Sequence, residues 1–101
     1  MSYDLQALKA QHGNKLSELK FETSEGQELV FVLKKPTRAT IEAIASIKDD
    51  GSKASKASKI MLANCVVAGP MEELEDGEVY TTVLEAVGKL FTKASFEVKK
   101  L

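Results

Sequence analysis

The sequence contains one cysteine, one histidine and no tryptophan. A lone cysteine cannot form an internal disulfide, and zinc sites are usually built from several cysteine and histidine side chains. We therefore expect neither a disulfide framework nor a metal site, and a reducing cytoplasm suits such a chain. We also expect no cofactor, because the sequence has no glycine-rich phosphate loop and no GxSxG or HExxH motif.

Long apolar runs and an excess of charge are absent as well. The longest apolar stretch is interrupted by Asn64, so no segment is expected to span a membrane, and the opening "MSYDLQALKA" is too polar for a signal peptide. The net charge at pH 7 is −1. Nucleic acids and anionic membranes attract strongly basic chains, so neither is an expected partner.

The only cysteine lies in the segment "IMLANCVVAGP", residues 60–70, where it could be a nucleophile, a metal ligand or part of the core. A reactive cysteine needs a nearby histidine, cation or helix N-terminus to lower its thiol pKa, whereas Cys65 is surrounded by Met61, Leu62 and Val66. Free cysteine is also among the most buried residue types. We therefore assign Cys65 to the core and expect no catalytic residues and no enzymatic activity.

Asn64 is the only polar residue between Ile60 and Ala68. A buried amide must form hydrogen bonds or it destabilises the fold by about 1–3 kcal/mol. Asn64 is therefore either a satisfied amide in the core or at a helix edge, which we favour, or a polar contact that sets the register of two helices or subunits.

The length of 101 residues fits a single domain spanning 1–101. Charge is unevenly distributed along it: residues 37–59 carry five bases and three acids, residues 60–88 six acids and no base, and residues 89–101 four lysines and one glutamate. Solvated helix faces explain this pattern most simply. Alternatively, opposite patches on neighbouring copies attract each other, so that the chain forms a homo-oligomer.

The first part of the chain predicts a helix followed by a hairpin. Residues 1–13 have apolar residues near helical spacing and end on Gly13, which favours a short, frayed helix. Residues 16–35 predict a β-hairpin, because two runs of alternating apolar residues flank a turn that contains Gly26. The core-facing positions of its strands are Leu19, Phe21, Thr23, Leu29, Phe31 and Leu33.

Residues 37–101 predict three or four helices. Thr37 is a candidate N-cap for a helix with an apolar stripe of Ile41, Ile44 and Ile47, and a further helix is expected to run to Ala68, before Gly69 and Pro70. Asp76 is expected to cap a last helix, for which residues 92–101 form a helical continuation or, less favoured, a strand. The stripe of that last helix is Tyr80, Val83, Leu84, Val87, Leu90, Phe91, Ala94, Val98 and Leu101.

The predicted fold class is therefore α+β, with an N-terminal β-hairpin followed by a bundle of three to four helices. Two features are candidates for contact with a protein partner. Val30 and Val32 make the second face of the hairpin apolar, and either the N-terminal helix or another subunit covers them. Lys53, Lys56 and Lys59 lie at a helix start, where cations oppose the helix dipole, so this edge is expected to face acidic groups such as those of residues 72–78.

The order of these elements resembles the small tail assembly chaperones of long-tailed bacteriophages and related prophages. The resemblance covers residues 16–101, and its most specific pieces are "KPT" directly after the hairpin and "MLANCVV" in the middle helix. It implies a non-enzymatic protein of the bacterial host cytoplasm that coats the long, aggregation-prone tape-measure protein until the tail tube polymerises around it. It also implies a longer, frameshifted form, for which the codons of Lys99 and Lys100 are candidates.

Two other interpretations remain. The chain could be a minor virion structural or head–tail joining protein, or a small cytoplasmic protein-interaction or regulatory domain. A small enzyme or a nucleic-acid-binding regulator is disfavoured, because the sequence offers no catalytic cluster and no basic face interleaved with aromatic residues.

Overall fold

The computed structural model describes residues 4–13, 15–91, 95 and 97–101. It is an α+β fold in which three antiparallel strands form one sheet of order β1-β2-β3. The elements in chain order are α1 (Leu5–His12), β1 (Leu16–Glu22), β2 (Glu28–Lys34), α2 (Arg38–Ala45), α3 (Lys53–Cys65), β3 (Val66–Ala68), the 3₁₀ helix η1 (Met71–Glu75) and α4 (Gly77–Gly88). Within the described residues, no helix has the length and hydropathy needed to cross a bilayer.

The hairpin forms as its alternating pattern predicts. β1 pairs with β2 from Leu16 opposite Lys34 to Glu22 opposite Glu28, and Gly26 adopts a φ of 84° in the turn between them. Leu29, Phe31 and Leu33 are buried on one face of the sheet. The short N-terminal helix also forms as expected. It ends at His12 and is followed by the C-cap residue Gly13, whose φ is 86°.

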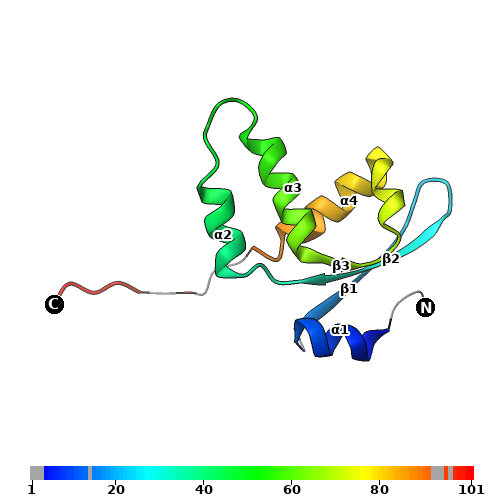
Figure 1. The fold of residues 1–101 in the computed structure, drawn as a ribbon, viewed down its shortest axis with the longest axis horizontal. Coiled ribbons are helices and arrows are strands. Elements are labelled where there is room, and N and C mark those ends of the chain that lie inside the picture. The colour runs from blue at the N-terminus through cyan, green and yellow to red at the C-terminus, as the bar shows by residue number, and fades with distance from the viewer. Residues whose placement is uncertain (1–3, 14, 92–94, 96) are drawn as a thin grey trace.

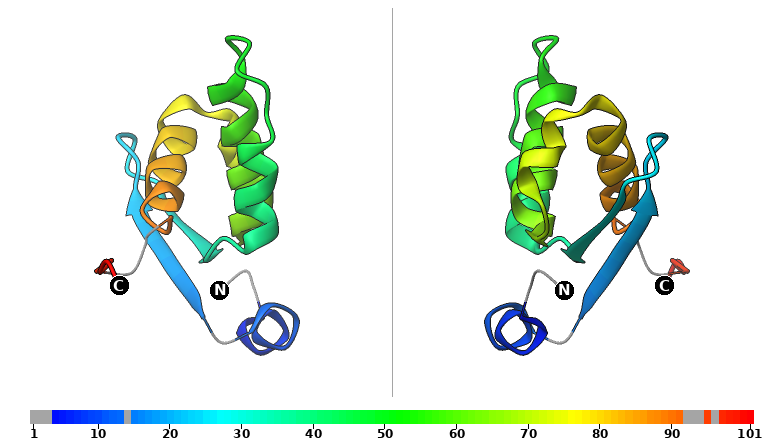
Figure 2. Two further views of the ribbon diagram at one scale, coloured as in Figure 1. Left: turned by 90° about the vertical axis from the view of Figure 1, so that its left-hand side faces the viewer. Right: turned by 90° about the vertical axis from the view of Figure 1, so that its right-hand side faces the viewer.

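The main core lies between this face of the sheet and two helices. α3 and α4 cover it, whereas α1 lies on the opposite side of the sheet (Figures 1 and 2). The buried side chains of the core are Leu29, Phe31, Leu33, Cys65, Val66, Val79, Val83 and Val87. The domain thus has two layers, the sheet on one side of the core and the helices α3 and α4 on the other.

The predicted extension of the third helix to Ala68 is wrong. α3 ends at Cys65, and Val66–Ala68 form β3, which pairs with β2 through Val32 opposite Ala68 and Leu33 opposite Val66. Two adjacent β-branched valines fit a pleated strand better than a helix. The pairing also satisfies backbone groups along the second edge of β2, a gain that local sequence does not reveal.

The predicted cap of the last helix is confirmed, but its buried stripe is rotated. The Asp76 side chain accepts hydrogen bonds from the backbone N–H groups of Glu78 and Val79, at 2.9 and 3.2 Å. Val79, Val83 and Val87 are buried, whereas the predicted Tyr80 and Leu84 are half-buried. The stripe centres on the valines because α4 packs between α3, η1 and the sheet, and sequence spacing alone does not determine that angle.

The predicted helix over residues 92–101 is also not observed. α4 ends at Gly88, and residues 95 and 97–101 belong to neither a helix nor a strand. Val98 and Leu101 are 84% and 117% exposed, so no packing surface compensates the entropy of ordering a helix there. The other positions of that prediction, residues 92–94 and 96, lie outside the described residues.

The helix after the hairpin begins as predicted but buries little of its apolar stripe. Thr37 caps α2 by accepting a hydrogen bond from the Thr40 N–H at 3.3 Å. Ile41 is 46% exposed and Ile44 and Ile47 are half-buried, because α2 packs against α3 and projects with it at one end of the molecule (Figure 1). The apolar side chains of α2 are therefore partly available to another molecule.

Candidate protein-binding surface

The two predicted valine contacts have different environments. They alternate with the core residues of β2 and so belong to the opposite face of the sheet, the side on which α1 lies (Figure 2). Val32 is 1% exposed, and therefore cannot touch a partner in this conformation. Val30 is half-buried, and its contact with a partner stays a prediction.

The lysines at the start of α3 do not pair with the acidic run of residues 72–78. The Lys56 ammonium lies 3.6 Å from the Asp50 carboxylate, which belongs to the loop directly before the helix. Lys53 is half-buried and Lys59 is exposed. The Asp50 carboxylate thus partly offsets the positive charge at this helix start. The role of the three lysines in partner binding stays a prediction.

The acidic run instead holds the β1–β2 turn. Glu78 accepts hydrogen bonds from the Ser24 backbone N–H at 3.0 and 3.1 Å and from its hydroxyl at 3.1 Å, while Glu73 accepts one from the Gln27 amide at 3.5 Å. Across the described part of the chain, no three potential ligands are grouped so as to hold a metal ion. These carboxylates therefore have an evident structural task, which is to connect the turn to η1 and α4.

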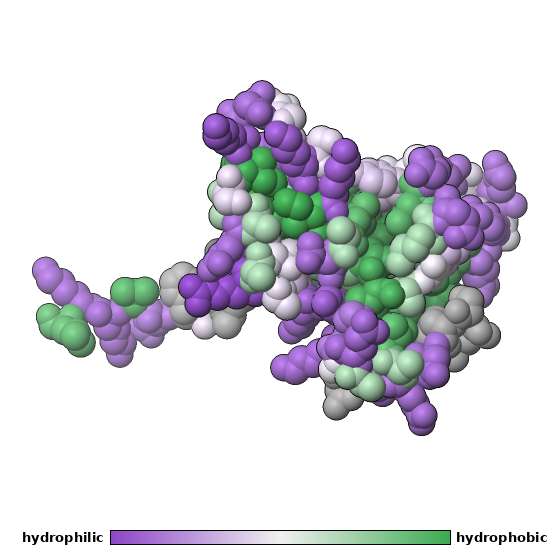
Figure 3. Space-filling model, viewed as in Figure 1, coloured by the Kyte–Doolittle hydropathy of each residue, from purple (hydrophilic) through white to green (hydrophobic). Residues whose placement is uncertain are grey.

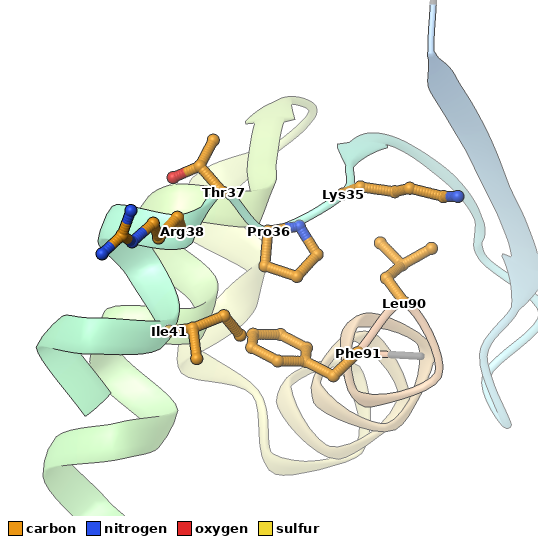
Figure 4. A pocket seen from close by; sticks show the side chains of 7 residues that line it. All are labelled: Lys35, Pro36, Thr37, Arg38, Ile41, Leu90 and Phe91. Carbon is orange, nitrogen blue, oxygen red and sulfur yellow. The ribbon is translucent and has the colours of Figure 1, made fainter. Parts of the chain in front are cut away.

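A groove between the start of α2 and the end of α4 is the strongest candidate for protein binding. This groove, called the α2 groove below, has a volume of about 400 Å³. Figure 4 shows the Ile41 side chain of α2 pointing at the Phe91 ring, with Pro36 close by. The lining residues are Lys35, Pro36, Thr37, Arg38, Ile41, Leu90 and Phe91.

The rim of the α2 groove is cationic. Lys35 and Arg38 line it, and none of the described residues that line it is acidic. The Arg38 side chain is 91% exposed and forms an ion pair with Glu42 of the same helix at 2.7 Å. An apolar floor with basic edges suits a protein segment that carries apolar and acidic side chains together.

A second groove, called the β1 groove below, lies between β1 and α4. It also has a volume of about 400 Å³, and it shares Leu90 with the α2 groove. Its apolar lining comes from Leu19, Leu33, Ala86 and Leu90. Its polar lining comes from Ser17, Glu18, Thr82, Glu85 and Lys89. The two grooves meet where α4 ends, so the surface at this end of the helix is incompletely covered.

Sequence reasoning missed both grooves, although it singled out several of their residues. Ile41, Leu90 and Phe91 were assigned to helix stripes, on the assumption that apolar stripes are buried. Figure 3 shows apolar side chains reaching the surface over α2 and α3 instead. One signal in the sequence could have indicated the grooves. The predicted helices carry more apolar stripes than one small sheet can cover, so part of them had to remain exposed.

Asn64 lies outside the core. It is exposed, and its side-chain amide donates a hydrogen bond of 2.8 Å to the backbone carbonyl of Ile60, one turn earlier in α3. The favoured interpretation, an amide satisfied at a helix edge, is therefore supported.

Cys65 is fully buried in the core, as its neighbours predicted. Burial raises the pKa of its thiol, and the nearby Lys34 opposes this only partly. We expect Cys65 in the folded chain to react with an aromatic disulfide reagent about a hundredfold or more slowly than in denaturant, because reaction requires the core to open. Equal rates in the two conditions would contradict the burial.

The raised pKa of the Cys65 thiol also makes the stability of the fold depend on pH. The folded state holds the thiol proton more tightly than the unfolded state. This contribution to stability is intact below the ordinary thiol pKa of about 8.5 and declines as the pH rises above it.

Comparison with models of known protein families, with curated proteins and with solved structures found no significant match. The function must therefore be inferred from the residues and surfaces described above.

Proposed function

We propose that this protein is a phage or prophage tail assembly chaperone, which binds the tape-measure protein in the bacterial host cytoplasm and keeps it soluble while the tail is assembled. The observation that carries the proposal is the α2 groove, an apolar cleft with a cationic rim on an otherwise small domain. The "KPT" segment, on which the family resemblance partly depends, forms one wall of this groove through Lys35, Pro36 and Thr37.

The chemistry of the α2 groove suits a helical client. Ile41 is 46% exposed and its side chain points at the Phe91 ring, so the two offer an apolar surface on which a side chain of a partner could pack (Figure 4). Grooves of this kind bind amphipathic helices through apolar residues that recur every three or four positions. A tape-measure protein is expected to be long, helical and apolar on some faces, and hence prone to aggregate without a partner.

Replacing Ile41 with glutamate tests the groove. We expect Ile41→Glu to weaken client binding by about 10- to 100-fold, because burying one isoleucine contributes about 1.5–3 kcal/mol. The measurement is co-expression with the candidate tape-measure protein, in which the soluble fraction of the client is followed. The client is the product of the unusually long gene expected to lie beside this one.

Ala43→Glu is the matched control, because Ala43 is exposed on the same helix and does not line the groove. It introduces the same charge and should leave the client soluble. The proposal is wrong if the wild-type chain fails to solubilise the client, and the assignment to the groove is wrong if both variants act alike. Recovery of the protein from purified particles would instead favour a minor virion structural or head–tail joining protein.

A further inference from the structure

β1 has an unpaired outer edge. It is a strand of seven residues that pairs with β2 on one side, and no other strand of the described chain lies along its second side. An unpaired edge presents backbone N–H and C=O groups in the spacing that a further strand requires. Lys20 and Glu22 place charges on this strand, but no proline or bulge interrupts it.

The β1 groove extends this edge into a binding site. Leu19 and Leu33 of the sheet and Ala86 and Leu90 beside α4 form its apolar lining. Ser17 and Leu19 are two positions apart on β1 and therefore share a face of the strand. A strand added at the edge would direct every second side chain toward this lining, so backbone pairing and apolar burial would occur together.

The chain itself contains a segment with the required pattern. In "SFEVKKL", residues 95–101, Phe96 and Val98 alternate with Glu97 and Lys99. The described residues of this segment form neither a helix nor a strand, and Val98 is 84% exposed. Lys100 shares the strand face of Phe96 and Val98 and complements the β1 groove, where Glu18 and Glu85 outnumber the single base Lys89.

The arrangement of the chain favours a second copy as the donor. Residues 97–101 extend away from the sheet of their own domain (Figure 1), so they do not occupy the outer edge of their own β1. We propose that residues 95–101 of a second copy add as a strand to the outer edge of β1, with the apolar residues of their alternating pattern turned toward the β1 groove. The β1 groove has Leu90 alone in common with the α2 groove, and the proposal does not depend on the identity of the client.

Cross-linking of two single variants tests the contact between copies. Ser17→Cys and Val98→Cys, both in the full-length chain, are mixed and treated with a short thiol-specific cross-linker. Val98 and Ser17 are both exposed, and the native Cys65 is buried, so it should not contribute. We expect about tenfold more cross-linked dimer in the mixture than when Ser55→Cys replaces Ser17→Cys, because docking raises the local concentration of the two thiols.

Ser55 is the matched control, since it is an exposed serine on α3 that lies outside the β1 groove. Equal dimer yields with Ser17→Cys and Ser55→Cys would overturn the proposal. A variant carrying both Ser17→Cys and Val98→Cys distinguishes the source of the strand. Its cross-linking within one monomer in dilute solution, without dimers in the mixture of single variants, would show that the segment docks on its own domain and would also overturn the proposal.

Val98→Asp provides a second measurement that does not depend on thiols. An exposed side chain in a segment without regular secondary structure does not contribute to the fold, so this variant should unfold like the wild type. If copies join through the added strand, the sedimentation rate of the wild type should increase with protein concentration. We expect this increase to be lost in Val98→Asp and retained in Ile41→Glu. Retention in both variants, or no such increase in the wild type, would contradict the added strand.

Discussion

Phe31→Ala should lower the free energy of unfolding by about 3–5 kcal/mol, the range found when a buried aromatic side chain is truncated. Phe31 is the largest side chain among those fully buried, with 0% exposed. Its ring stacks on that of Phe21 with centroids 6.2 Å apart and planes 6° from parallel. The loss is a large fraction of the total stability of about 5–15 kcal/mol that is usual for a protein.

Urea denaturation followed by circular dichroism measures this effect. The transition midpoint should fall while the slope is unchanged, because the loss is expected in the folded state rather than in the compactness of the unfolded state. Phe21→Ala is the matched comparison, since Phe21 is half-buried on the neighbouring strand and should lose less. A loss below about 1 kcal/mol for Phe31→Ala would contradict the central position of this ring in the core.

Gly69→Ala should destabilise the protein by about 2–4 kcal/mol, the sum of two separate costs. A Cβ atom at position 69 would lie 2.5 Å from Cδ1 of Phe31, which is well inside van der Waals contact. Gly69 also has a φ of 138°, a conformation that side-chain-bearing residues rarely adopt. The backbone of Gly69 approaches the Phe31 ring closely because β3 ends directly beside β2.

Two controls separate these costs in the same denaturation experiment. Gly51 has a φ of 91° and open space where a Cβ would lie, so Gly51→Ala reports the backbone cost without the clash. In the Phe31→Ala background the ring is absent, and Gly69→Ala should then cost about 1–3 kcal/mol less than in the wild type. Additive effects of the two substitutions would show that the close approach of Gly69 to Phe31 is not the cause.

The sequence predicted the residue types of the candidate site but not their arrangement in space. The sequence identifies Ile41, Leu90 and Phe91 as apolar positions of helices and Lys35 and Arg38 as charged residues near a helix start. These residues meet in one groove because the β2–α2 connection approaches the end of α4. The two segments are about half of the chain apart in sequence. Val32 illustrates another limit, because the pattern left open whether the chain itself or another subunit covers this side chain, and the structure buries it within the chain.

The sequence by itself determined the elements whose causes are local. Alternating apolar residues and Gly26 specify the hairpin, and the side chains of Thr37 and Asp76 specify where α2 and α4 begin, because each acts on backbone groups within a few residues. Apolar neighbours likewise placed Cys65 in the core. Tertiary structure decided the rest. Val66–Ala68 form a strand because β2 has an edge to pair with, and α4 buries its valines because of the angle at which it packs. The apolar stripe of α2 stays partly exposed because α3 and α4 already cover the small sheet. Pairing partners and packing angles involve residues far apart in the chain, and local pattern carries no record of them.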